Sequence, residues 1–282
     1  MKIGMVILNY NDSETTIELL ENIKDYSVLD NIVVVDNYST DNSYETLKRY
    51  ESEKIKVIRT DKNGGFGYGN NIGANCLLSE GIDYIIFSNP DIIVEENVIV
   101  VLKESFAECK NAAVIAPTIN EHGNISKGWK LKGPIFDSFT NINYLGRFFK
   151  KKLLYSDEYY NEKYSKVDAT SGCFFAIRGD VFEKIDGFDE NIFLYYEENV
   201  LAKKIKSIDM DIIVRNDIQI IHNHSVSINK SYNKIKKFKA LAKSQRYYHR
   251  KYNNAGKIGM LFLYLSYAIT MVISYFLAIF NK

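Results

Sequence analysis

Apolar and polar positions alternate in blocks along the first 117 residues. Five apolar runs of strand length are separated by stretches in which apolar residues recur at helical spacing. The expected strands are residues 3–8, 31–36, 54–59, 84–87 and 112–116. Strands and helices alternate four times at short spacing, which predicts an α/β fold built on a parallel, doubly wound sheet.

The pattern is less regular from residue 118 to residue 167, where we expect a hairpin and loops laid over one face of the sheet. Order returns at residues 168–178, which read as a strand, and in a helix that ends near residue 206. Two short strands are expected at residues 211–215 and 218–221.

The C-terminal stretch has a different pattern. Residues 258–280 contain no charged side chain, and a membrane-spanning helix needs about 20 such residues. Residues 230–257 carry ten Lys and Arg, with apolar residues at helical spacing between them, which is typical of a basic amphipathic helix on anionic lipid. The tyrosines and hydroxyl residues of the apolar run leave an interfacial helix or a hairpin as the alternative to a spanning helix.

Charge is distributed unevenly. The chain has 36 Lys and Arg against 35 Asp and Glu, yet no acidic residue follows Asp217. The last 65 residues hold 11 of the basic residues, so the first 217 carry 25 minus 35, or −10. A basic tail on an acidic body predicts an anionic partner, and the adjacent apolar run favours a membrane over nucleic acid. The positive-inside tendency then places the body in the cytoplasm. The three dispersed cysteines fit a reducing compartment.

Two carboxylates follow expected core strands directly. Asp36 ends the second strand, and Asp91 comes just after Asn89-Pro90, where proline stops the fourth strand. Ligand sites of open α/β sheets lie at the carboxyl ends of their strands. The alternative is that each aspartate only caps the helix that follows. The glycine-rich segment 63–73 lacks the spacing of a dinucleotide-binding motif. Two interpretations remain: its backbone amides face an anion or a nucleotide, or it is a flexible turn.

Seven short segments, in this order, resemble the inverting family 2 glycosyltransferases. They are VDNYSTD (35–41), NGG (63–65), NNIG (70–73), SNPD (88–91), SGCF (171–174), GFDE (187–190) and FLYYEE (193–198). The match covers roughly residues 1–225 and is similar to the rhamnosyltransferase-like branch of bacterial surface-polysaccharide enzymes. It implies the GT-A fold: α/β, with a mostly parallel, doubly wound sheet, a smaller mixed C-terminal sheet and a membrane-associated helical tail.

The resemblance implies a nucleoside-diphosphate sugar donor and a divalent Mg or Mn ion. The implied donor-binding residues are Asn9, Asp36, Asn63, Gly65, Asn70, Asn89 and Asp91. Asp91 belongs to the D-x-D-type metal motif of the family, in which Asn89 replaces the first acid. One carboxylate supplies only part of the oxygen ligands that a dication prefers. The resemblance therefore places His222 beside Asp91 as a second metal ligand, with His224 as the alternative.

The acidic pair Glu197-Glu198 corresponds to the catalytic pair of the family, and we expect Glu198 to be the base, with Glu197 as the alternative. The chain departs from the family here, because the second acid is Glu rather than Asp and a further acid is replaced by Val200. Without the resemblance, two acids at a helix start could simply stabilise its N-terminus. Expected acceptor-side residues are Gly172, Asp189 and Trp129. The alternatives are a turn and a cap for Gly172 and Asp189, and core or surface packing for Trp129.

These expectations predict a sugar transferase that acts on a glycan or lipid-linked glycan acceptor at the cytoplasmic face of the cell membrane. Residues 1–225 would form the GT-A domain, with a donor half (1–117) and an acceptor half (118–225). Residues 226–257 would form the basic helix and residues 258–280 the membrane anchor. A metal-dependent nucleotidyltransferase and a catalytically inactive nucleotide-sugar-binding protein remain alternatives.

Overall fold

The computed structural model describes residues 1–142, 145–223 and 234–280. Its first half is a parallel α/β unit with strands in the order β3-β2-β1-β4. The elements are β1 Ile3–Asn9, α1 Ser13–Ile23, β2 Asn31–Asp36, α2 Ser43–Lys48, β3 Ile55–Arg59, α3 Phe66–Ser79 and β4 Tyr84–Ser88. The chain moves outward from β1 to β3 and then returns to the other side of β1, so the switch in strand order lies between β1 and β4.

The second half extends the same sheet. Its elements are β5 Ile92–Ile93, α4 Glu96–Glu108, β6 Ala112–Glu121, β7 Asn124–Ser126, β8 Tyr164–Val167, β9 Phe174–Arg178, α7 Gly179–Lys184, α8 Glu197–Lys206 and β10 Asp211–His222. Strand β9 is inserted between β4 and β6 and runs antiparallel to both. The α/β class and the mostly parallel central sheet are confirmed. The expected separate mixed sheet is wrong, because these strands join one ten-stranded sheet.

The region expected to be irregular contains helices as well as the hairpin of β6 and β7. It holds α5 Pro134–Thr140, α6 Leu145–Lys151 and the short 3₁₀ helix η1 Asp157–Tyr160. The two short strands expected at the end of the domain form the single strand β10, which pairs with β6 across a shift in register between Arg215 and Gln219. The irregular pairing explains why the sequence pattern looks interrupted there.

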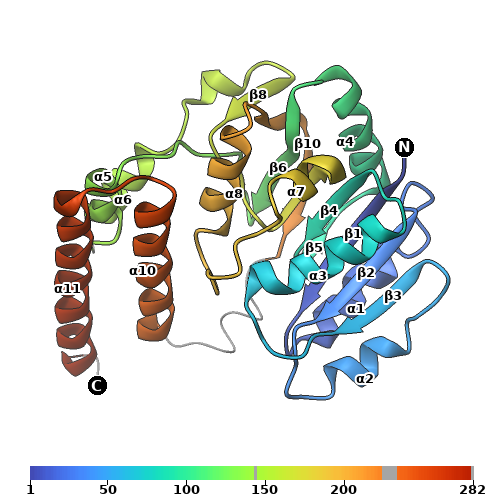
Figure 1. Cartoon of the computed structure of the whole chain (residues 1–282), viewed down its shortest axis with the longest axis horizontal. Helices are drawn as coiled ribbons and strands as arrows, with labels where there is room; N and C mark the ends of the chain where they lie inside the picture. The colour runs from blue at the N-terminus through green and yellow to red at the C-terminus, as the bar shows by residue number, and fades with distance from the viewer. Residues whose placement is uncertain (143–144, 224–233, 281–282) are drawn as a thin grey trace.

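Two helices complete the described chain, α10 Lys234–Lys251 and α11 Lys257–Phe280. They form a helical hairpin that lies at the end of the molecule away from β3, next to α5 and α6 (Figure 1). Helix α11 packs on α5 and α10. Residues 257–275 are apolar and long enough to cross a membrane, with a mean hydropathy of 1.7, although 28% of this window is buried inside the protein.

Helix α3 begins at Phe66, so much of the glycine-rich segment 63–73 is helical rather than a flexible turn. Gly69 and Gly73 lie one turn apart and face the sheet. A Cβ at Gly69 would lie 2.3 Å from Leu8 Cδ1, and one at Gly73 would lie 2.5 Å from Val6 Cγ1. These glycines therefore allow α3 to approach β1 and β2 closely, which is a packing role that the sequence reading missed.

We predict that Gly73→Ala lowers the free energy of unfolding by about 1–3 kcal/mol, because the added methyl group meets two buried valines. Urea denaturation followed by circular dichroism would measure the change. Gly256→Ala is the matched control, since a Cβ at this position has no neighbour within 4 Å. An equal effect of both substitutions would contradict the packing role of Gly73.

Candidate functional site

The carboxyl edge of the sheet gathers most of the residues singled out in the sequence. Strands β1, β2 and β4 end there, and β10, which runs parallel to β6, ends there with His222. Antiparallel β9 begins at the same edge, where the backbone N–H of Asn89 donates to the carbonyl oxygen of Cys173 at 2.8 Å. This edge includes the switch between β1 and β4, the usual position of a ligand site in an open α/β sheet.

Asn9 and Asp36 lie together and are fully buried at the ends of β1 and β2. Asn9 Nδ2 donates to Asp36 Oδ1 at 2.9 Å, and the backbone N–H of Ser39 donates to Asp36 Oδ2 at 3.0 Å. Asp36 therefore orders the turn that follows β2. The contact of both residues with a nucleotide base stays a prediction.

The exposed groups above this turn were missed in the sequence. Tyr38 is 46% exposed and has a positive φ of 63°, which is uncommon for an aromatic residue. The Arg59 guanidinium lies 5.3 Å from the centre of its ring and 5.4 Å from that of Tyr44. Positive φ at a non-glycine residue has no clear signature in a single sequence.

The glycine loop is held against the segment that precedes α8. Asn63 Oδ1 accepts a hydrogen bond from Gly65 N at 3.2 Å. Gly65 has a φ of 93° and lies so close to Phe193 that a Cβ would be 2.3 Å from the Phe193 carbonyl oxygen. Phe66 N donates to that oxygen at 3.0 Å. Asn70 is buried inside α3, where its side chain bonds to the Phe66 carbonyl oxygen at 3.1 Å.

The structure brings Asp91 and His222 together, as the sequence predicted. His222 Nε2 lies 3.2 Å from Asp91 Oδ1, and its Nδ1 lies 3.1 Å from Oε1 of Glu121, which the sequence did not single out. Burial lowers the pKa of His222, but its contacts with Asp91 and Cys173 outweigh burial and raise the pKa to about 11. His224 lies outside the described residues.

The donor atoms around His222 suit a hard divalent ion in kind, being two carboxylates and one imidazole. They do not form a complete shell, since over residues 1–142, 145–223 and 234–280 no group of three or more His, Cys, Asp or Glu side chains is arranged to hold a metal. Any ion at this place would therefore need oxygen atoms from a ligand or from water.

Glu197 and Glu198 open α8 after a strained turn. Tyr195 and Tyr196 both have left-handed backbone, with φ of 69° and 72°, and such strain is common at functional sites. Burial and the neighbouring charge of Glu198 raise the pKa of Glu197 to about 8, and burial also raises the pKa of Glu198. The structure thus places a pair of proton-binding groups at the start of one helix.

Gly172 lies against the acidic pair. Its backbone N–H donates to Glu198 Oε1 at 3.2 Å, and a Cβ at this position would lie 3.0 Å from the same atom. Gly172 is therefore placed to position Glu198, whatever its predicted role with the acceptor. Val200, which replaces a family acid, is buried beside Ile192 and Tyr248, so α10 supplies an apolar surface where the acid would otherwise lie.

Trp129 and Asp189 have structural partners. Trp129 Nε1 donates to Asn199 Oδ1 at 3.1 Å, and Trp129 lines a cavity of about 160 Å³ between α5, α6, α8 and α10. Asp189 Oδ2 accepts hydrogen bonds from Tyr247, Lys251 and Tyr252. Burial raises the pKa of Asp189, but these bonds outweigh burial and hold the pKa well below its usual range. Their acceptor roles stay predictions.

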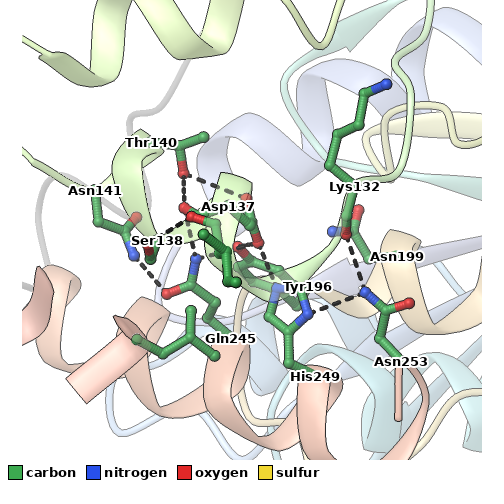
Figure 2. Close-up of polar contacts among 12 residues, drawn as sticks. Lys132, Asp137, Ser138, Thr140, Asn141, Tyr196, Asn199, Gln245, His249 and Asn253 are labelled. Carbon is green, nitrogen blue, oxygen red and sulfur yellow. Dashed lines mark hydrogen bonds and ion pairs between the residues drawn. The ribbon is translucent and has the colours of Figure 1, made fainter. Parts of the chain in front are cut away.

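The buried carboxylate of Asp137 connects α10 to the turn at Tyr195 and Tyr196 that precedes Glu197 (Figure 2). Its Oδ2 atom accepts from the Tyr196 hydroxyl at 2.5 Å, from His249 Nε2 at 2.8 Å and from Gln245 Nε2 at 3.1 Å. Burial raises the pKa of Asp137, but these partners outweigh burial and lower the pKa. Asp137 therefore joins α5, α10 and the residue that precedes Glu197.

Helix α10 holds the segment 189–196 at two further points. Its Tyr247, Lys251 and Tyr252 surround Asp189, as described above. Ser244 Oγ donates to the carbonyl oxygen of Leu194 at 2.8 Å. The basic helix expected to lie apart from the catalytic domain is therefore packed against the segment that leads to Glu197 and Glu198.

Comparison with known proteins gives a family match and two curated relatives. The family model described as glycosyl transferase family 2 matches residues 5–186. The low-salt glycan biosynthesis hexosyltransferase Agl10 of Haloferax volcanii is 27% identical over 225 residues, which are 79% of this chain and 68% of that protein. The rhamnosyltransferase WbbL of Escherichia coli K12 is 28% identical over 151 residues, which are 50% of this chain and 54% of that protein.

Two solved structures show likeness of fold alone, because their sequence identities are low. GalNAc-T7 with UDP, GalNAc and Mn²⁺ matches with a TM-score of 0.62 at 15% identity, over 80% of this chain and 44% of that one. The mannosyltransferase PcManGT of Pyrobaculum calidifontis with GDP-Man and Mn²⁺ has a TM-score of 0.61 at 14% identity, over 97% of this chain and 75% of that one. The chain thus spans only about half the length of WbbL and less than half of GalNAc-T7.

We predict that Asp137→Asn lowers the free energy of unfolding by about 3 kcal/mol, because an amide cannot accept all the buried hydrogen bonds that the carboxylate accepts. Urea denaturation would measure the loss. Asp180→Asn is the control, since it removes a partly exposed ion pair with Arg178, keeps an oxygen that can accept from Val181 N, and should cost less than about 1 kcal/mol. Equal losses in the two variants would show that the Asp137 network is not a main contact between tail and body.

Proposed function

Because the chain belongs to glycosyl transferase family 2, we propose that it is an inverting glycosyltransferase that moves a sugar from a nucleoside-diphosphate donor to a glycan or a lipid-linked glycan. A glycosyl transfer role in glycan biosynthesis follows from the family and from its curated relatives. The resemblance seen in the sequence is confirmed. One observation carries the proposal, namely that the Asp91–His222 pair and the Gly172–Glu198 contact lie at the same edge of the sheet, at neighbouring strands.

Glu198 is the residue we assign as the catalytic base. One backbone N–H holds its carboxylate, and a carboxylate has further lone pairs with which to accept the proton of an acceptor hydroxyl. The acceptor oxygen then attacks the anomeric carbon opposite the diphosphate. The new C–O bond forms as the bond to the diphosphate oxygen breaks, so the configuration inverts and the proton passes to Glu198.

We assign donor binding to the residues around Asn9, Asp36 and the glycine loop, and a Mg or Mn site to Asp91 and His222. The oxygen and nitrogen donors of these two side chains fit such an ion when donor phosphates supply further oxygens. When bound, the ion would supply positive charge that stabilises the leaving diphosphate. Asn63, Gly65, Asn70 and Asn89 order the loops that surround the donor in this proposal.

We place the reaction at the cytoplasmic face of the cell membrane, in the assembly of bacterial cell-surface polysaccharide. The basic helix α10 and the apolar helix α11 support a membrane-associated enzyme. Family membership favours sugar transfer over nucleotidyl transfer. An inactive binding protein differs from both in having no turnover.

A panel of UDP-, GDP- and dTDP-sugars tests the proposal. Purified full-length protein is incubated with each donor, with Mn or Mg and with a lipid-linked glycan, and released nucleoside diphosphate and glycosylated product are measured. Release of nucleoside diphosphate together with product supports sugar transfer. Release of sugar 1-phosphate, with the nucleoside monophosphate transferred to the acceptor, would indicate nucleotidyl transfer, and donor binding without turnover would indicate an inactive protein.

We predict that Glu198→Gln lowers kcat by about 100-fold or more, because the amide cannot take the acceptor proton. The affinity for the donor should stay close to that of the wild type, as measured by calorimetry. Glu197→Gln is the matched variant on the same turn and should retain more activity. Turnover at the wild-type level in Glu198→Gln would overturn the assignment.

We also predict that the acid limb of the kcat profile lies well above the usual range of glutamate. Raised pKa values mean that the pair binds protons as the pH falls from about 8 towards 4.5, so the unprotonated base is lost over that range. Glu197→Gln removes the group whose pKa is about 8, so this limb should move to the lower pH at which Glu198 alone takes up its proton. Profiles of Glu197→Gln and of the exposed control Glu183→Gln would check this; a limb that stays in place in both would contradict the coupling.

A further inference from the structure

Helix α11 is apolar on two sides. It buries Leu263 and Met271 together with Ser266 and Thr270, and it exposes a second set of apolar side chains. The exposed residues recur every three or four positions and are each 45–67% exposed: Ile258, Leu261, Leu265, Ile269 and Val272. We call these five residues the outer stripe. An amphipathic helix on the surface of a soluble protein has one apolar stripe, which faces the core, whereas α11 has a second stripe that is exposed. An exposed stripe of this length marks an interaction surface.

The opposite face of α11 is committed to the protein. Gly259 packs on Pro134 of α5, since a Cβ there would lie 2.6 Å from Pro134 Cγ. Thr270 Oγ1 donates to the carbonyl oxygen of Asn141 at 2.8 Å, and Ser266 is buried on the same helix. The outer stripe is therefore held in a fixed orientation by α5.

Helix α10 runs beside α11 (Figure 1). It carries basic residues along its length. Phe238 stacks on Tyr267 with ring centres 5.7 Å apart. The Arg246 guanidinium lies 5.1 Å from the ring centre of Tyr264 and 4.8 Å from that of Tyr267, near the middle of α11. If α11 crossed a bilayer while docked in this way, Arg246 and its neighbours would enter the hydrocarbon, where charged side chains are strongly disfavoured.

The helices next to α11 add to the same type of surface. Ile135 of α5 and Leu145 and Phe148 of α6 are exposed apolar residues, and α6 ends in the basic residues Lys150 and Lys151. Exposed cations on α10 include Lys239, Lys243 and Arg250. Because no acidic residue follows Asp217, the tail has no carboxylate of its own to neutralise them. A surface that combines exposed apolar residues with exposed cations complements an anionic lipid surface, which offers both acyl chains and negative charge, rather than the acidic surface of another protein.

We propose that α10 and α11 lie in the plane of an anionic membrane surface, with the outer stripe embedded at the boundary between headgroups and acyl chains and with no segment of 257–275 crossing the bilayer. The proposal deepens the membrane association included in the proposed function and rests on it. It replaces the spanning anchor with attachment to one leaflet. Because α10 also holds residues 189–196, it would place the turn before Glu197 and Glu198 at a fixed position relative to the lipid surface.

Flotation with vesicles tests the surface. The full-length protein is mixed with vesicles of phosphatidylcholine alone or with phosphatidylglycerol added, and we expect stronger binding to the anionic vesicles. The double variant Leu265→Glu/Ile269→Glu should lower the partition coefficient by about tenfold or more, because it places charge in the stripe. Ile125→Glu, an equally exposed isoleucine on β7, is the control and should bind like the wild type. Unchanged binding of the double variant would overturn the proposal.

Depth-dependent quenching separates an in-plane helix from a spanning one. In a Trp129→Phe background, which removes the only tryptophan, Leu261→Trp, Leu265→Trp and Val272→Trp are made one at a time. We expect all three to be quenched most by lipids brominated near the headgroup. A spanning helix would place the tryptophan of Leu265→Trp deepest, so that it is quenched most by lipids brominated far down the acyl chain while the other two are quenched most near the headgroup. That result would overturn the proposal.

A second copy of the chain is the competing occupant of the outer stripe. A dimer that the double variant converts to monomer, without vesicle binding by the wild type, would overturn the proposal. Circular dichroism checks that each variant is folded. These readouts do not use turnover, so a protein that binds vesicles in the plane but transfers no sugar would contradict the proposed function alone.

Discussion

The site depends on the insertion of β9, antiparallel, between β4 and β6. Because β9 runs opposite to its neighbours, its first residues arrive at the edge where the parallel strands end. The hydrogen bond between Asn89 N and the Cys173 carbonyl oxygen fixes the turn that carries Asp91. Gly172, one residue earlier, reaches Glu198. One strand thus connects the proposed donor-phosphate site to the proposed base, and a parallel strand in that position would bring the opposite end of the segment.

Local patterns predicted the parallel half of the fold well, because each strand of β1 to β4 is a short apolar run with its own turn signal. They also indicated that Asp36 ends and Asp91 follows a strand, and that both strands end at the same edge of the sheet. The position of β9 was not predictable in the same way, since it depends on pairing between Ser88 and Phe174, far apart in the chain. The helical conformation of the glycine-rich segment was not predicted, because glycines usually break helices, whereas here close packing on the sheet outweighs their low propensity.

The network around Asp137 shows a second limit of sequence reading. Asp137 and His249 are 112 positions apart, and neither belongs to a recognisable motif. A buried carboxylate whose Oδ2 atom accepts three hydrogen bonds becomes visible only when α5, α8 and α10 are placed together (Figure 2). The composition of the C-terminal stretch clearly indicated an apolar helix, but the sequence did not predict which face of residues 257–275 would be buried. That depends on small and hydroxyl side chains, Gly259 and Thr270, which match α5.

The two roles of α10 constrain each other. The helix contacts the segment before Glu197 through hydrogen bonds of Ser244 and His249, and it flanks α11 through aromatic and cation–π contacts with Tyr267. Buried polar contacts tolerate little displacement, because a donor or acceptor left unpaired costs about 1–3 kcal/mol. A rigid α10 therefore keeps a constant geometry between the outer stripe and Glu198. In the proposed arrangement, an acceptor presented from a membrane would reach Glu198 through its own length and flexibility, because α10 and α11 would not move.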